Sequence, residues 1–308
     1  MTLQIEYQSQ SFPGVYSVPR KGVLATSWDE LLWAAITIGR PSTYHVFQYG
    51  PASFNEAIFR LSLVRMTVEQ DWYGRLSRTG AFAALDPTEK GMVSYFLGMT
   101  LCKLFASRIL HTPWLLHLDV FRPCLNPILL GRSRPDLVGE NDAGMWHAFE
   151  SKGRSSQPSL GDKQKAKLQA QRLVSVNGVP CSLHIGSFAF FKSDLLEFYW
   201  KDPEPDTKEP IELPRPDEEW RYYYEPALSI ASWSEEPAFI FERERADVVV
   251  KIHPKIRHLL DEGRWREARE AAKELQDEFK GDGFQPDGLR VIAGESWRRL
   301  FEERQRDL

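Results

Sequence analysis

The spacing of apolar residues changes along the chain and predicts both helices and strands. In residues 53–73, apolar side chains recur at three- and four-residue steps, which predicts a helix with one packing face. Residues 92–110 are apolar almost all round, as expected of a helix enclosed by other elements. Residues 114–121 and 181–191 are short apolar runs, which indicate buried strands. The pattern therefore predicts a mixed α/β protein.

Local signals indicate where several helices begin and end. Ser27, followed three positions later by Glu30, forms a capping box that predicts a helix over residues 28–38. Residues 86–89, DPTE, place an N-cap residue, a proline and an acid in the order that opens a helix. Asp162 is expected to cap a further helix over residues 163–176, which ends at the Asn-Gly pair that follows.

Strands are expected between and after the last two of these helices. Residues 134–139 and 145–152 are predicted to be strands on either side of a turn at 141–144, and residues 195–200 add another strand. From residue 86 onward the predicted order is therefore helix, three strands, helix, strand, strand.

Composition divides the chain into three regions. Residues 1–85 are expected to be a mainly helical N-terminal region, and residues 86–203 form the core. Residues 204–308 begin as an arm rich in proline and acidic residues and continue as helices, including a hairpin of helices over 254–261 and 264–279. Such a hairpin most often covers a domain, but it could also bind a protein partner or a second copy of the chain.

The overall composition excludes some classes of protein. A chain of 308 residues, 42% of them hydrophobic, is long enough for a sizeable core. A net charge of -4 does not mark a bulk polyanion binder, so any contact with nucleic acid must come from local basic patches. Three cysteines without a CxxC pair predict a reducing cytoplasm, and neither a signal peptide nor a membrane span is expected.

The candidate chemistry lies in Asp136, Glu150 and Lys152. Alternate residues of a strand share a face, so Glu150 and Lys152 are expected on one face and His147 on the other. The turn at 141–144 would bring Asp136 beside them. Taken separately these residues are an ordinary turn carboxylate and a solvated strand end, but together with the predicted element order they favour a site.

Two carboxylates and a lysine suit metal-dependent phosphodiester hydrolysis. Mg²⁺ prefers carboxylate and carbonyl oxygens, so Asp136, Glu150 and the backbone carbonyl of Ser151 are candidate ligands. Such a metal would polarise a phosphate, while Lys152 could orient the attacking water and offset charge in the transition state.

Arg134-Pro135-Asp136 followed by Glu150-Ser151-Lys152 resembles the PD-(D/E)xK nuclease superfamily, whose fold is called restriction-endonuclease-like. The resemblance covers about residues 86–203 and implies an α+β fold with an α-β-β-β-α-β core and a mixed central sheet. It also implies a nuclease that requires Mg²⁺ or Mn²⁺ and acts on DNA more readily than on RNA. Restriction or phage defence, repair and mobile-element processing all suit the superfamily.

The resemblance adds candidates on the two core helices. An acid on the first helix often joins the metal site in this superfamily, and Glu89 matches that position. Polar or basic residues on the second helix often contact substrate; here the matching residues are Lys163, Gln164 and Lys167. With Arg154 they belong to a segment in which basic residues greatly outnumber acids, which indicates a backbone-tracking groove or simply a solvated face.

A second class of function stays open from the sequence. A noncatalytic nucleic-acid-binding or assembly protein could keep the same fold and use its flanking helices as a partner surface. Residues 220–224, WRYYY, could stack on bases or pack the arm against the core.

Overall fold

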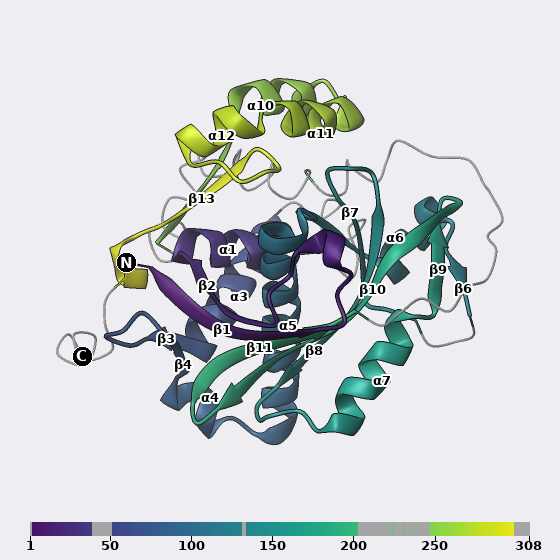
Figure 1. The fold of residues 1–308 in the computed structure, drawn as a ribbon. Helices are drawn as coiled ribbons and strands as arrows, with labels where there is room; N and C mark the ends of the chain where they lie inside the picture. The colour runs from purple at the N-terminus through teal and green to yellow at the C-terminus, as the bar shows by residue number, and fades with distance from the viewer. Residues whose placement is uncertain are drawn as a thin grey trace.

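A computed structural model describes residues 2–38, 51–130, 134–202 and 247–298, together with Tyr224 and Ala231. The fold is mixed α/β and is built on one large mixed sheet (Figure 1). Its main strands, in spatial order, are β2 (Lys21–Thr26), β1 (Leu3–Gln10), β11 (Leu195–Lys201), β10 (Val179–Lys192), β8 (Trp146–Arg154), β7 (Leu137–Glu140) and β5 (Trp114–His117). Neighbours are antiparallel except β1 with β11 and β8 with β10, which are parallel.

Short strands extend the sheet at its margins. β4 (Leu76–Arg78) pairs with β11 and with β3 (Val68–Gln70), and β9 (Leu173–Val176) pairs with β10 and with β6 (Ile128–Leu129). The N-terminal region therefore contributes strands to the central sheet as well as the helices α1 (Trp28–Thr37), α3 (Pro51–Thr67) and α4 (Gly80–Ala84).

The long helix α5 (Pro87–Leu110) packs on one face of the sheet. The predicted start of this helix at Asp86 is confirmed: the Asp86 side chain accepts from the Thr88 N–H, and Glu89 accepts from the Asp86 N–H. In the described part of the chain α5 is the helix long and apolar enough to cross a membrane, yet 78% of its most apolar window is buried inside the fold. Its apolar surface is thus used for packing against β8, β10 and α1.

Helix α7 (Leu160–Ala170) covers the other face. Gly186 of β10 lets it approach closely, because a Cβ at this position would lie 2.9 Å from the Lys167 backbone nitrogen. Gly186 is paired in parallel register with Glu150, so both residues face α7. Gly153 lies three positions after Glu150 on β8, so it is on the opposite face of the strand and faces α5. The sheet therefore lies between the two helices.

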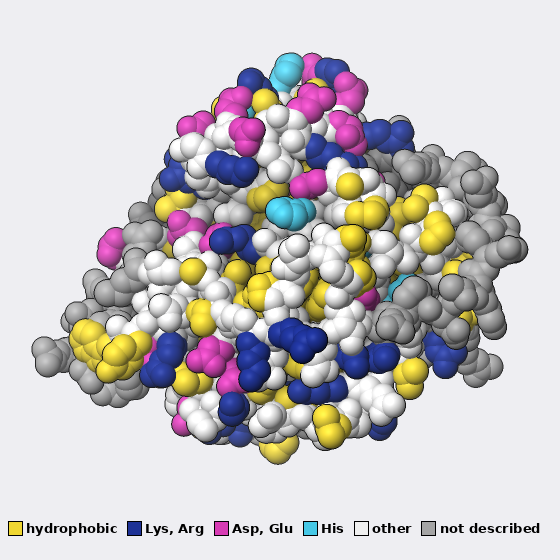
Figure 2. All heavy atoms as spheres, in the orientation of Figure 1, with side chains coloured by type: hydrophobic (Ala, Val, Ile, Leu, Met, Phe, Trp, Pro, Cys, Tyr) yellow, Lys and Arg dark blue, Asp and Glu magenta, His cyan; other side chains and the backbone are white. Residues whose placement is uncertain are grey.

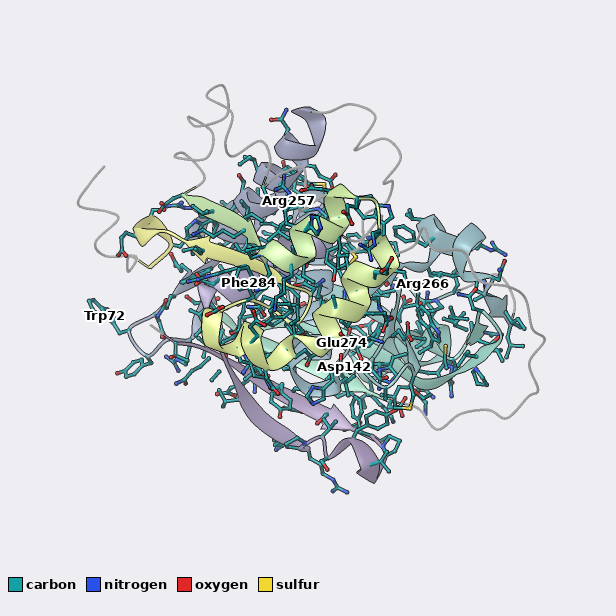
Figure 3. The ribbon with its side chains drawn as sticks, turned by 90° about the horizontal axis from the view of Figure 1, so that it is seen from above. Trp72, Asp142, Arg257, Arg266, Glu274 and Phe284 are labelled. Carbon is teal, nitrogen blue, oxygen red and sulfur yellow. The ribbon has the colours of Figure 1, made fainter. Side chains whose placement is uncertain are left out.

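The C-terminal region forms a layer over the core, seen from above in Figure 3. It contains α10 (Pro254–Asp261), α11 (Trp265–Glu274), α12 (Gln276–Asp282) and α13 (Glu295–Arg298), with a two-stranded sheet of β12 (Val248–Ile252) and β13 (Leu289–Ala293). The predicted helical hairpin is confirmed, and the turn between its helices contains Gly263 at φ +72°. The buried apolar side chains of α10 and α11 are Ile256, Leu260, Ala268 and Ala272.

Three predicted boundaries were wrong. The helix expected over 53–73 ends at Thr67, where β3 begins with a β-branched residue. The strand expected over 114–121 ends at His117, and α6 (Leu118–Leu125) follows at once. The helix expected over 163–176 begins at Leu160 after the N-cap Ser159 and ends at Ala170.

The last of these errors has a clear physical cause. Residues Leu173–Val176 form β9, and Asn177 and Gly178 turn the chain into β10 with φ values of 49° and 76°. An Asn-Gly pair with two positive φ angles is the turn that joins a tight hairpin. The predicted arm, including residues 220–223, lies largely outside the described residues, as do residues 299–308 of the C-terminal region.

Candidate functional site

The candidate site lies where β7 begins and β8 approaches its end. Leu137 of β7 pairs with Phe149 of β8, so Asp136 comes next in register, opposite Glu150. The Asp136 carboxylate is held in place because its Oδ2 accepts a hydrogen bond from the Ser151 backbone N–H at 3.0 Å. The antiparallel pairing thus brings together two carboxylates that are fourteen positions apart in the sequence.

Lys152 completes a group of three charged side chains. Its Nζ forms an ion pair with Glu150 Oε1 and lies 4.0 Å from Asp136 Oδ2. The structure therefore brings Asp136, Glu150 and Lys152 together, as their strand positions predict. His147 points to the other face, where its Nδ1 lies 2.9 Å from Thr112 Oγ1. Burial lowers the pKa of His147 to about 3, so it is neutral at physiological pH.

Burial dominates the electrostatics of the two carboxylates. The Glu150 side chain is 0% exposed, and burial, followed by the charge of Asp136, raises its pKa to about 7 although Lys152 opposes the shift. Burial likewise raises the pKa of Asp136, while Lys152 and the Ser151 N–H act in the opposite direction. The single ammonium group of Lys152 therefore lies beside two carboxyl groups, and it can neutralise the charge of only one of them.

The carboxylates of Asp136 and Glu150 are suitable ligands for a divalent cation. Lys152 and the Asp136 backbone favour the ionised form of the buried Glu150 carboxylate, but they do not outweigh its burial. Within those residues there is no group of three or more His, Cys, Asp and Glu side chains that could enclose a metal ion. Mg²⁺, however, is commonly held by one or two carboxylates together with water and substrate phosphate. Asp136 and Glu150 meet this smaller requirement.

Glu89 lies apart from the three charged residues. It is exposed, and its carboxylate accepts from the Asp86 backbone N–H at 3.0 Å, as part of the cap of α5. The structure thus shows Glu89 in its helix-capping contact and does not bring it to Asp136.

Tyr95 of α5 and Asp119 of α6 are two residues at this site that sequence reasoning missed. Burial, and then the charges of Asp136 and Glu150, raises the pKa of Tyr95 to about 12, so its phenol lies within their electrostatic reach. Asp119 also acts on Asp136 and forms an ion pair with Arg134. In the sequence Tyr95 is one more residue of an apolar helix, and nothing local distinguishes the position that meets β8.

The basic residues predicted to contact substrate have several intramolecular partners. Lys163 Nζ lies 3.7 Å from the centroid of the Tyr199 ring, and Arg154 Nη2 lies 2.9 Å from Asp162 Oδ1. Lys167 lies close enough to Asp202 to oppose the burial that raises the pKa of that acid. Gln164 is exposed on α7. Figure 2, in the orientation of Figure 1, shows Lys and Arg side chains gathered on the lower part of the molecule, around α7 and nearby strand ends.

A small and mostly apolar cleft lies elsewhere, between α1, α3 and α5. Its lining residues include Arg60, Val64, Phe96 and Leu97, but none of the three charged residues. The Arg60 guanidinium donates to the Ala35 and Ile38 carbonyls and so closes the end of α1. We therefore place the candidate chemistry at the open group on β7 and β8 and not in this cleft.

Comparison of the chain with family models, with curated proteins and with solved structures finds no match in any of the three. What the fold defines by itself is a mixed α/β protein with a large mixed central sheet. Its function must be argued from the geometry of the site.

Proposed function

We propose that the protein is a metal-dependent nuclease that hydrolyses phosphodiester bonds, with DNA favoured over RNA as substrate. The observation that carries this proposal is the convergence of Asp136, Glu150 and Lys152 on one face of the β7–β8 pair. The Glu150 carboxylate, which is buried with one ammonium group beside it, adds to it.

The order of elements supports a restriction-endonuclease-like core. Helix α5 is followed by β5, β7 and β8, then by α7 and by β10, which lies parallel to β8. This succession agrees with the α-β-β-β-α-β order that the sequence resemblance implies, with α6, β6 and β9 as additions. We therefore propose that residues 86–203 form a nuclease core of this type.

Asp136 and Glu150, with the backbone carbonyl of Ser151, would hold Mg²⁺ or Mn²⁺. When bound, such a cation supplies positive charge that polarises the scissile phosphate and stabilises the charge that develops on it. The Ser151 N–H keeps the Asp136 carboxylate oriented for this role. A cation would also favour the ionised form of Glu150, whose pKa burial raises.

Lys152 provides the mobile positive charge of the site. Its side chain is 35% exposed, so the ammonium group can reach solvent and substrate while its stem stays beside Glu150. We assign to it the orientation of the attacking water and the stabilisation of negative charge on the phosphate oxygens.

Substrate binding is assigned to the basic residues next to the site. Arg154 is the last residue of β8, and Lys163, Gln164 and Lys167 lie on α7. The ion pair between Arg154 and Asp162 is exposed, so it is weak and a phosphate can compete for the guanidinium. A cytoplasmic location belongs to the proposal and is supported by Cys102 and Cys181, which are free and buried.

The proposal is tested by incubating the purified protein with linear duplex, circular duplex and single-stranded DNA and with RNA. Each substrate is tested with Mg²⁺, Mn²⁺ and EDTA, and the products are scored for nicks, double-strand breaks and resected ends. We expect cleavage of DNA that depends on the metal. Absence of cleavage on every substrate with both metals would contradict the proposal.

A noncatalytic nucleic-acid-binding protein is the second candidate. It is favoured by the contact of Lys152 with Glu150, which already neutralises one of the two proposed ligands. Titration calorimetry separates the candidates. Mn²⁺ binding that disappears in Asp136→Asn supports the enzyme, whereas unchanged DNA affinity with no metal binding supports the binding protein.

A further inference from the structure

Exposed aromatic side chains form a strip on α3 and α5. Tyr95, Phe59 and Met92 are 39%, 44% and 49% exposed. The ring of Phe96 joins them, because its centroid lies 5.6 Å from that of Tyr95 and 5.9 Å from that of Phe59. We call these four residues the aromatic strip. A contiguous group of large apolar side chains exposed to solvent is characteristic of a binding surface.

The strip lies at the same end of β8 as the candidate catalytic site, on the face of the sheet that α5 covers. A Cβ on Gly153, the residue after Lys152, would lie 1.5 Å from the Ser94 carbonyl oxygen and 2.9 Å from the Tyr95 nitrogen. The backbones of β8 and α5 are therefore in contact where the strip starts. Asp136 and Glu150 also act electrostatically on the Tyr95 phenol. Glu150 faces α7, so a strand whose phosphate lies at Asp136 and Glu150 reaches Tyr95 by passing around this end of β8.

The chemistry of the strip fits the faces of nucleobases. Aromatic rings bind unpaired bases by stacking, largely without regard to sequence. In a duplex each base face is covered by the neighbouring base pairs, so a protein ring can stack only after a base has left the helix. A strip of rings beside a phosphate-cleaving site thus selects unpaired nucleotides.

Not every exposed aromatic residue belongs to this arrangement. Trp72 and Tyr73 are 65% and 76% exposed at the turn between β3 and β4. Figure 3 shows Trp72 at the outer rim of the molecule. Arg75 already lies over the Tyr73 ring. Trp72 therefore offers an exposed aromatic control that lies away from the strip.

We propose that Tyr95, Phe96 and Phe59 stack unpaired bases of the strand that is cleaved, so that the substrate is single-stranded or frayed nucleic acid. This inference rests on the proposed nuclease function and adds the class of substrate to it. Met92 borders the stacking surface with its flexible, apolar side chain.

The test measures binding of a single strand about 12 nucleotides long, within the length that one such site covers, and of its duplex. Phosphorothioate linkages resist hydrolysis, and one 2-aminopurine reports stacking through its fluorescence. The single strand and the duplex are each titrated, in Mn²⁺, with wild type and with Tyr95→Ala, Phe59→Ala, Tyr95→Phe and Trp72→Ala. Circular dichroism verifies that each variant is folded.

We expect Tyr95→Ala and Phe59→Ala each to weaken single-strand binding roughly fivefold or more, since loss of one stacking contact has that effect. The 2-aminopurine signal should rise as stacking is lost. Tyr95→Phe keeps the ring and Trp72→Ala keeps the strip, so both should bind as wild type does. Duplex binding should change little in any variant.

Other results would overturn the inference. Equal losses for single strand and duplex would show a general effect on binding, and no loss in either Ala variant would show that the strip is not used. In both cases cleavage by wild type would leave the proposed nuclease function standing. If wild type binds neither DNA, the proposed function and the inference fail together.

Discussion

At the scale of single residues, the site combines two buried acids with one lysine. Lys152 contacts Glu150 and lies near Asp136, but one ammonium group cannot offset both the burial of two carboxylates and their mutual repulsion. Burial accordingly raises the pKa of both acids, that of Glu150 to about 7. Without a cation, two buried acids of this kind lower the stability of the folded chain. Such strongly shifted pKa values are typical of functional sites.

The Glu150 carboxyl should make stability depend on pH. Its pKa is about 7 in the folded chain against an ordinary value of 4.5, so the folded state holds the proton more tightly. The stability that it contributes is fully present below about pH 4.5 and is lost as the pH rises through about 7. Glu150→Gln stays neutral throughout. Between about pH 5 and about pH 8 in EDTA, its Tm should therefore fall less than that of wild type.

Differential scanning fluorimetry measures this comparison. Asp202, whose pKa burial also raises to about 7, is present in both proteins, so the difference between the two slopes reports Glu150 together with its effect on Asp136. Parallel slopes would contradict the account of Glu150. The Tyr95 position shows the limit of sequence reasoning at this scale, because its approach to two acids depends on how α5 meets β8.

At the scale of elements, two glycines set the distance between α5 and β8. A Cβ on Gly98 would lie 2.7 Å from the Gly153 nitrogen, and one on Gly153 would meet the Ser94 carbonyl. Both contacts involve backbone atoms, which have little freedom to move aside. The close approach positions the end of β8, with Lys152, beside Tyr95.

Gly98→Ala should therefore push α5 away from β8. We expect a loss of about 1 to 3 kcal/mol in the free energy of unfolding, as for other overpacked cores, together with weaker DNA cleavage. Gly91→Ala on the same helix is the control, because a Cβ there meets nothing within 4 Å. It should leave stability unchanged or raise it slightly, since alanine favours helix. Urea titration compares them, and equal stability of the two variants would refute the role of Gly98.

Local signals in the sequence predicted some elements well and missed others. The strands around residues 141–144 and the start of α5 were predicted because a turn and an N-cap signal act over a few residues. β9 was taken for the end of a helix, because a short apolar run after a helical pattern fits either structure. The parallel pairing of β1 with β11 joins residues far apart in the chain, and no local pattern predicts it.

At the scale of the whole molecule, the C-terminal layer is attached to the core by buried polar contacts. Trp33 Nε1 donates to Asp287 Oδ2 at 2.8 Å, and the Leu289 N–H donates to Oδ1 of the same carboxylate. Arg269 of α11 donates to Glu140 of β7 at 2.8 Å. Figure 3 shows Asp142, in the β7–β8 turn, beside the end of α11, and Gln276 donates to it. The layer thus lies against the same hairpin that carries the site.

Asp287→Ala should loosen this layer. It removes a carboxylate that is 0% exposed and leaves the Trp33 and Leu289 donors without that acceptor. We expect a loss of about 2 to 4 kcal/mol in the free energy of unfolding. Asp277→Ala, at a side chain 100% exposed, should cost little. Denaturant titration measures both, and a near-neutral Asp287→Ala would show that the layer is held mainly by its apolar contacts.

The sequence predicted the C-terminal helices but not the surface that they cover. The hairpin was evident from two helical segments separated by a short break, whereas the partners of Arg269 and Asp287 come from β7 and α1. Such contacts are set by the packing of the whole molecule. A protein partner or second copy bound through these helices stays a prediction.

The most direct test of the central claim is cleavage of supercoiled and single-stranded circular DNA by wild type and Asp136→Asn in Mn²⁺. Asn keeps the size of the side chain and can still accept from the Ser151 N–H, but it removes a charged ligand. The account predicts metal-dependent cleavage by wild type and a loss of about a hundredfold or more in the variant, with similar Tm. Equal cleavage by the two proteins, or none by wild type, would contradict it.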